Sequence, residues 1–85
     1  MLDQDVALLI LNVVGPFDGR RIRADIVRSN VNAKSVRPMT LCQFEEAIRE
    51  MKSRNWVSER YTEFGQSEIG ITPDGQLIRE KHNQG

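Results

Sequence analysis

Apolar side chains predict a first helix between Asp3 and Val14, where they cover most of the helical circumference. An aspartate near its start, Asp3 or Asp5, can cap free N–H groups and suits the positive end of the helix dipole. Gly15 and Pro16 end this helix. A helix that packs on one side needs only an apolar stripe. The surplus apolar surface therefore indicates either a central helix in a small core or a face buried between two copies of the chain.

A weaker apolar pattern predicts a second helix, which starts after Asp18 as its N-cap and reaches about Ser29. Ile22, Ile26 and Val27 are expected to form the inward stripe of this helix. The arginines of the same segment are then left for its rim and its outer faces.

The third helix is the best-marked element of the chain. Residues 30–39 are expected to form an irregular connection of ten residues that leads to it. Thr40 and Gln43 have the spacing of a capping box at its entrance. Asn55 can adopt the left-handed conformation that closes a helix. The apolar face between these limits follows the helical period and consists of Leu41, Phe44, Ala47, Ile48 and Met51.

A β-hairpin and a last helix are predicted after the third helix. The first strand is expected to run from Trp56 to about Thr62, and the return strand covers residues 67–71. Gly65 lies in the turn between them and is free to adopt a positive φ. The last helix begins with Thr72 as its N-cap, followed by a proline at the first helical position.

These elements amount to one small α+β domain, expected over residues 1–80, with residues 81–85 as a frayed tail. Cys42 is the only cysteine, so an internal disulfide and a two-cysteine metal site are both impossible. A reducing, cytoplasmic location is therefore expected. Residues 2–14 form the only strongly apolar stretch, which is too short to span a bilayer and lacks the basic start of a secretion signal.

The charges of the chain are unevenly distributed, although the net charge is zero and gives no general attraction to nucleic acid. Residues 20–37 contain six arginine and lysine residues against one aspartate, whereas residues 1–19 and 38–75 are both net negative. Nearly all of the positive bias therefore lies in one short segment. That segment is a surface for an anionic partner, a solvated face, or a face that docks against the acids of the third helix.

Three segments of the chain resemble the winged helix-turn-helix domains of PadR-like and MarR-like transcriptional regulators. The third helix and its exit read FEEAIREMKSRNWV, the segment after the hairpin reads ITPDGQLI, and the opening of the chain reads ALLILNVVGPFDGRRIRADI. The resemblance covers nearly the whole chain. It implies an α+β winged helix with a three-helix core, a wing hairpin of two or three strands, and a C-terminal helix. It also implies a transcriptional regulator that binds duplex DNA.

The resemblance places DNA contacts on the basic segment, on the start of the third helix and on the wing. At the helix start, Thr40 and Gln43 have an alternative role in which they only cap the helix. Arg49 in mid-helix can instead pair with neighbouring glutamates. Three glutamates of this helix, Glu45, Glu46 and Glu50, oppose phosphate binding, although one of them can accept from a cytosine amino group. The predicted DNA-binding residues are Arg20, Arg21, Arg23, Arg37, Thr40, Gln43, Arg49 and Arg60.

The sequence gives little support to enzyme chemistry, and we expect neither activity nor cofactor. His82 lies in the expected tail, and no ordered base accompanies Cys42. No metal-ligand spacing and no phosphate-binding loop are present in the sequence. The expected partners are duplex DNA and a second copy of the chain, which would be held through the first and the last helix. The alternative is a winged helix that serves protein–protein interaction without binding DNA, since fold alone does not fix function.

Overall fold

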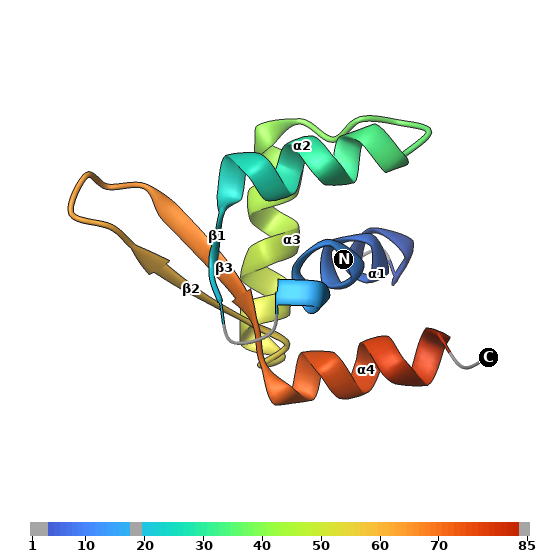
Figure 1. The fold of residues 1–85 in the computed structure, drawn as a ribbon. Helices are drawn as coiled ribbons and strands as arrows, with labels where there is room; N and C mark the ends of the chain where they lie inside the picture. Colours follow the sequence, from blue (N-terminus) through green and yellow to red (C-terminus); the bar gives the residue numbers. More distant parts are fainter. Residues whose placement is uncertain (1–3, 18–19, 84–85) are drawn as a thin grey trace.

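The computed structural model describes residues 4–17 and 20–83, which form four α-helices and a three-stranded antiparallel sheet (Figure 1). The helices surround one end of the sheet, and the hairpin projects beyond them. In chain order the elements are α1 (Gln4–Val14), the short 3-10 helix η1 (Gly15–Phe17), β1 (Ile22–Arg23), α2 (Ala24–Lys34), α3 (Leu41–Ser53), β2 (Val57–Tyr61), β3 (Ser67–Ile71) and α4 (Pro73–Asn83).

Helix α1 is the centre of the core, as one of the two readings of its sequence predicted. It contacts α2, α3, α4 and β3, so apolar residues are needed on most of its circumference. Leu8 is packed against the edge of the core cluster, and five side chains of α1 are buried in it: Ala7, Ile10, Leu11, Val13 and Val14. The expected starting residue, Asp3, lies outside the described residues.

The start of α2 differs from the prediction, and the expected N-cap, Asp18, lies outside the described residues. Ile22 and Arg23 are not helical but form the edge strand β1, which pairs with Ile69 and Glu68 of β3. The pairing joins residues far apart in the sequence, so helical periodicity did not reveal it. The helix itself begins at Ala24, and Arg23 takes the N-cap position without a side-chain cap.

The end of α2 also differs, because the helix continues to Lys34 and shortens the expected connection to residues 35–40. Val27 is buried as predicted, but Ile26 is exposed, and Val31 one turn further on is the other buried residue of this helix. The side chain of Asn32 fixes the connection: its amide donates to the Met39 carbonyl at 3.3 Å and its oxygen accepts from the Met39 N–H at 2.9 Å.

The capping box at the start of α3 is confirmed. The Thr40 hydroxyl accepts from the Gln43 N–H at 3.2 Å, and the Gln43 side-chain oxygen accepts from the Thr40 N–H at 3.0 Å. Phe44 and Met51 are buried as predicted, but the Leu41 side chain is 54% exposed because it lies beyond the core at the first turn of the helix. This leucine is therefore surface rather than core.

The hairpin completes a sheet with the strand order β1-β3-β2. Its register pairs Val57 with Ile71 at the base and Tyr61 with Ser67 near the turn. Gly65 has a φ of 76°, as the predicted turn requires. Because side chains alternate between the faces of a strand, the buried Ile71 and the partly buried Ser67 lie on the same, inward face.

The exit of α3 and the entrance of α4 meet at one junction. Asn55 has a φ of 61°, as predicted for the residue that closes α3. The Thr72 N–H donates to the Trp56 carbonyl at 3.1 Å, and the Thr72 hydroxyl donates to the Asn55 carbonyl and accepts from the Gly75 N–H. The Asn55 amide also donates to Asp74 at 3.0 Å. From here α4 extends to Asn83, so part of the segment expected to fray is helical.

A second contact holds the hairpin against α3. The Glu59 carboxylate of β2 accepts from the Lys52 ammonium of α3 at 2.7 Å and from the Ser67 hydroxyl of β3. Partial burial by itself raises the pKa of the Glu59 carboxyl, but the two hydrogen bonds and the Lys52 charge lower it by more, and the net pKa shift is downward. We call these three residues, Lys52, Glu59 and Ser67, the Glu59 cluster.

Replacing Gly75 by alanine should destabilise the fold at the junction. A Cβ there would lie 2.1 Å from the Trp56 carbonyl oxygen and 2.9 Å from a side-chain carbon of Ile71, so the backbone must move. The cost of such overpacking, about 1–3 kcal/mol, exceeds the gain of up to about 1 kcal/mol in helix propensity. Urea denaturation of Gly75→Ala measures the difference, with Glu80→Ala on an exposed position of α4 as the control. A variant at least as stable as the wild type contradicts this account.

Replacing Glu59 by glutamine should cost about 1 kcal/mol of unfolding free energy at neutral pH, since it removes a charge-assisted hydrogen bond with a half-exposed partner. The folded-state pKa of Glu59 is below its unfolded value, so its contribution is complete above the unfolded pKa and is lost as the pH falls through the folded pKa. The wild type and Glu59→Gln should therefore converge in acid, as denaturation at several pH values can show. Glu63→Gln, in the exposed turn, is the control, and a difference independent of pH would exclude a role for the ionised carboxylate.

Candidate nucleic-acid interface

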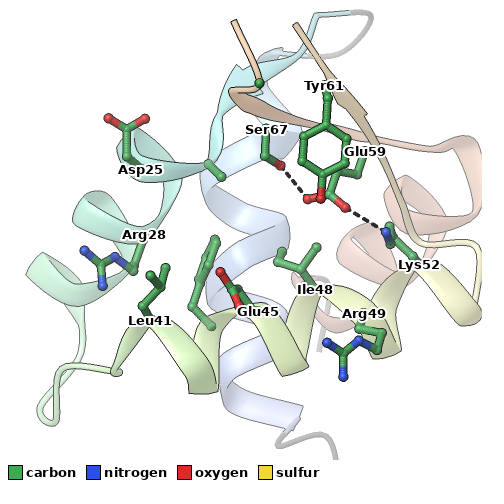
Figure 2. Close-up of a pocket in the computed structure, with 13 residues that line it drawn as sticks. Asp25, Arg28, Leu41, Glu45, Ile48, Arg49, Lys52, Glu59, Tyr61 and Ser67 are labelled. Atoms are coloured by element: carbon green, nitrogen blue, oxygen red, sulfur yellow. Dashed lines mark hydrogen bonds and ion pairs between the residues drawn. The ribbon is translucent and has the colours of Figure 1, made fainter.

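A groove of about 550 Å³ separates the hairpin from the helices (Figure 2). One wall is the first half of α2, the floor is the exposed side of α3, and the other wall is the inward face of the hairpin. The polar and exposed residues that line it are Asp25 and Arg28 of α2, Leu41, Glu45, Arg49 and Lys52 of α3, and Glu59, Tyr61, Gly65 and Ser67 of the hairpin.

The floor of the groove is apolar where α3 meets the core. Phe44 and Ile48 are buried and line its base, while Leu41 and Tyr61 are exposed at its rim. The apolar residues of α3 thus pack into the core, and the residues that directly follow them in the sequence, Glu45 and Arg49, face the groove. The helical period fixes this division, because positions four apart lie on one line of the helix surface.

The charges of the groove are partly neutralised by the contacts that build it. Glu59 is bound by Lys52 and Ser67, and Asp25 forms an ion pair with Arg23 at 3.6 Å. The remaining charged side chains are Arg28, Arg49 and Glu45, and the structure pairs none of them within the described residues. The groove therefore retains two positive charges and one negative charge.

Only one of the three α3 glutamates faces this groove. Glu45 lines it, whereas Glu46 is exposed elsewhere on the helix and Glu50 is half-buried outside the groove. The repulsion that the sequence predicted between this helix and a phosphate backbone is therefore reduced to a single carboxylate in the groove.

Of the predicted contact residues on α3, only Arg49 lines the groove. Thr40 and Gln43 do not line it, and the capping box occupies the oxygen atoms of both side chains. Their capping role is thus established by hydrogen bonds. A base contact by Gln43 is left to its amide N–H groups.

Arg20 and Arg21 precede β1 and are not part of the second helix, contrary to the prediction. They run beside Gly70 of β3: a Cβ on this glycine would lie 3.1 Å from a side-chain carbon of Arg21 and 3.3 Å from the Arg20 carbonyl oxygen. The glycine thus allows the arginine segment to approach the sheet closely. Both arginines are exposed.

Two more of the predicted arginines lie in one row across the sheet. Arg23 of β1 and Arg60 of β2 are both register partners of Glu68 in β3, and Arg60 forms an ion pair with Glu68 at 3.6 Å. Paired residues share a face of a sheet, and the neighbouring Ile69 is buried on the opposite face. Arg23 and Arg60 therefore lie on the face turned away from the groove.

Arg37 lies apart from the other predicted residues, in the connection between α2 and α3. Its N–H donates to the Ser35 hydroxyl at 3.3 Å, and this hydroxyl donates to the Arg37 carbonyl at 2.8 Å. The structure therefore places the predicted set in four regions: the groove, the outer face of the sheet with the segment before it, this connection, and the capping box at the start of α3.

Several groove residues were not in the predicted set of DNA-binding residues, among them Arg28, Leu41, Glu45 and Tyr61, although Arg28 belongs to the basic segment that the sequence analysis singled out. A spacing of four between Leu41, Glu45 and Arg49 was visible in the sequence and could have identified the exposed line of α3. The approach of Arg28 to that line depends on the packing of α2 against the rest of the fold and left no local signal.

Other kinds of site find no basis in residues 4–17 and 20–83. This part of the chain contains no group of three histidine, cysteine, aspartate or glutamate residues that could hold a metal ion. Its helices are also all too short or too polar to cross a membrane. The single cysteine, Cys42, is exposed in the first turn of α3.

Comparison with known proteins identifies the fold. No protein-family model matches the chain, and no curated protein has significant sequence similarity to it. A PadR family transcription regulator from Clostridium difficile has a similar fold, with a TM-score of 0.78 and 17% identity over 93% of this chain and 83% of that one. A winged-helix DNA-binding protein from STIV has a TM-score of 0.81 and 15% identity over 99% of this chain and 89% of that one. A transcriptional regulator from Clostridium thermocellum has a TM-score of 0.77 and 14% identity over 99% of this chain and 86% of that one. Together with the order of helices and strands, these similarities establish that the chain has the winged-helix fold, with β2 and β3 as its wing.

Proposed function

We propose that this chain is the DNA-binding domain of a transcriptional regulator and that duplex DNA lies against the groove between α3 and the wing. The observation that carries the proposal is the pair Arg28 and Arg49, two arginines from different helices that line one groove and have no acidic partner in the part of the chain that the structure describes. Two of the similar structures are a PadR family transcription regulator and a winged-helix DNA-binding protein, which supports the same class of function.

The proposed mechanism is local electrostatic attraction by an otherwise neutral chain. Phosphate contacts supply much of the affinity of a protein for DNA and release bound counterions. Arg28 and Arg49 would bind phosphates on the two sides of α3. Two of the three carboxylates that line the groove are already paired, since Glu59 is bound to Lys52 and Asp25 to Arg23, and Glu45 is the one that still repels the backbone.

The other predicted residues take supporting roles in this proposal. Arg20, Arg21 and Arg37 would position the domain on flanking phosphates without reading sequence. Arg23 and Arg60 would contribute less, because each already has an acidic neighbour and lies on the outer face of the wing. Thr40 and Gln43 would fix the start of α3 rather than contact bases.

A protein-binding role is the second candidate. It is favoured by the exposure of aromatic residues on the wing, where Phe64 at the turn is 89% exposed and Tyr61 is also exposed. The two functions differ in their response to salt, since binding that depends on phosphates weakens steeply as the salt concentration rises.

Removing Arg28 or Arg49 should weaken binding to a mixed-sequence duplex. It should also lower the slope of log affinity against log salt by about one unit for each arginine, because each releases about one counterion. Fluorescence anisotropy over a salt series measures both quantities for Arg28→Ala, Arg49→Ala and the double variant. The matched control is Arg54→Ala, since Arg54 lies over the Trp56 ring, 5.2 Å from its centroid, and does not line this groove.

Two outcomes would reject the DNA-binding proposal. The wild type would fail to bind duplex DNA even at low salt, or the slope would fall as much in Arg54→Ala as in the two groove variants. A wild type that binds no DNA would leave the protein-binding role as the function to test.

We also propose that α1 and α4 supply the contact of a homodimer. Leu77 of α4 is 64% exposed, and α1 leaves Leu8 and Leu9 only partly buried. A twofold contact between such faces would cover apolar surface that the single chain leaves open.

Replacing Leu77 by glutamine should shift the chain toward the monomer at equal concentration, because it places a polar side chain in the proposed contact. Sedimentation equilibrium measures the change, and Val36→Gln, in the exposed connection between α2 and α3, should leave the dimer unchanged. A wild-type chain that stays monomeric at high concentration contradicts the proposed dimer.

A further inference from the structure

One line of α3 is available to bases in the groove. Leu41, Glu45 and Arg49 follow one another at intervals of four residues and all line the groove (Figure 2). The neighbouring residues of α3 already have structural roles, because Thr40 and Gln43 form the capping box and Phe44 is buried in the core. In a helix that enters the major groove, residues of the first turns reach the base edges. The polar residue of this line nearest the helix start is Glu45.

Glu45 has no hydrogen-bond or ion-pair partner among residues 4–17 and 20–83, although two arginines share its groove. The described residues place neither Arg28 nor Arg49 in an ion pair with it, and its carboxylate faces the open groove (Figure 2). A glutamate that faces the phosphates without a donor reduces affinity. Such a residue discriminates between partners when one of them supplies the missing donor and the others do not.

The chemistry of a carboxylate restricts the donors that it can use. An ionised carboxylate only accepts hydrogen bonds. In the major groove, guanine presents two acceptors and thymine presents an acceptor and a methyl group, so both repel or fail to satisfy it. The adenine amino group lies beside the N7 acceptor, whereas the cytosine amino group has no neighbouring acceptor on its own base. Cytosine is therefore the base that a lone glutamate fits.

We propose that Glu45 is the specificity-determining residue of this domain and selects a cytosine by accepting a hydrogen bond from its amino group. The proposal rests on the DNA-binding function proposed above. Arg28 and Arg49 supply the attraction that allows a carboxylate to lie in the groove. Leu41 and Arg49 are each about 6 Å from Glu45 along the helix axis, which is nearly two base-pair steps, so Glu45 reads one position by itself.

The test is selection of binding sites from a randomised duplex library with the wild type and two matched variants. Glu45→Gln and Glu46→Gln each remove one negative charge from the exposed surface of α3, but only Glu45 lines the groove. Wild type and Glu46→Gln should both select a cytosine at one position, with a preference over other bases of about ten- to a hundredfold. Glu45→Gln should select adenine there, because an amide pairs with both polar groups of that base.

The outcomes separate this inference from the function on which it rests. If the wild type binds duplex DNA but Glu45→Gln selects the same sequences, Glu45 is not the reader and the inference fails while the DNA-binding function stands. The same holds if the wild type binds DNA without any base preference. If the wild type selects no duplex at low salt, both proposals fail together. A base change that appears equally in Glu46→Gln also overturns the inference, since it would then follow from charge alone.

Discussion

The direction of the wing is set by a few hydrogen bonds that join the end of α3 to the start of α4. Thr72 binds the carbonyl groups of Asn55 and Trp56, and its hydroxyl also caps α4 at Gly75. The hydrogen bonds of this one threonine therefore join the end of α3, the start of β2, the end of β3 and the start of α4. A side chain at position 75 would occupy the space of the Trp56 carbonyl, so this close approach requires glycine. The groove exists because the hairpin leaves α3 at the angle that this junction imposes.

The Glu59 cluster acts on the same geometry further along the hairpin and also shapes the charge of the groove. A chain with no net charge cannot attract a polyanion by its average field. Here Glu59, the one wing glutamate that lines the groove, is paired with Lys52 and Ser67 in the contact that holds the wing in place. The charges left over, Arg28, Arg49 and Glu45, come from two helices and define the polar character of the surface. The residues that hold the wing in place are thus different from the residues whose charges stay unpaired within the described part of the chain.

Local signals in the sequence were sufficient for most of the fold. The capping box of α3, the left-handed Asn55, the turn at Gly65 and the start of α4 all depend on residues within one or two turns of each other, and the structure confirms them. Strand β1 was missed because two residues carry no period, and their partner lies more than forty positions away. The set of groove residues predicted from the sequence was incomplete for the same reason. The contact between Lys52 and Glu59 and the approach of Arg28 depend on packing between elements, whereas the line from Leu41 to Arg49 was readable from its spacing.

The turn of the wing, residues 62–66, is stabilised by its own hydrogen bonds, and its outermost side chain is almost fully exposed. Thr62 binds Gln66 and Gly65 within the turn, while Phe64 is exposed. All the contacts that orient the hairpin lie nearer its base. The wing can therefore be lengthened or shortened by pairs of residues, which preserves the alternation of its two faces, without disturbing the core. The length of the hairpin can therefore change, by evolution or by loop grafting, while the core of the domain stays the same.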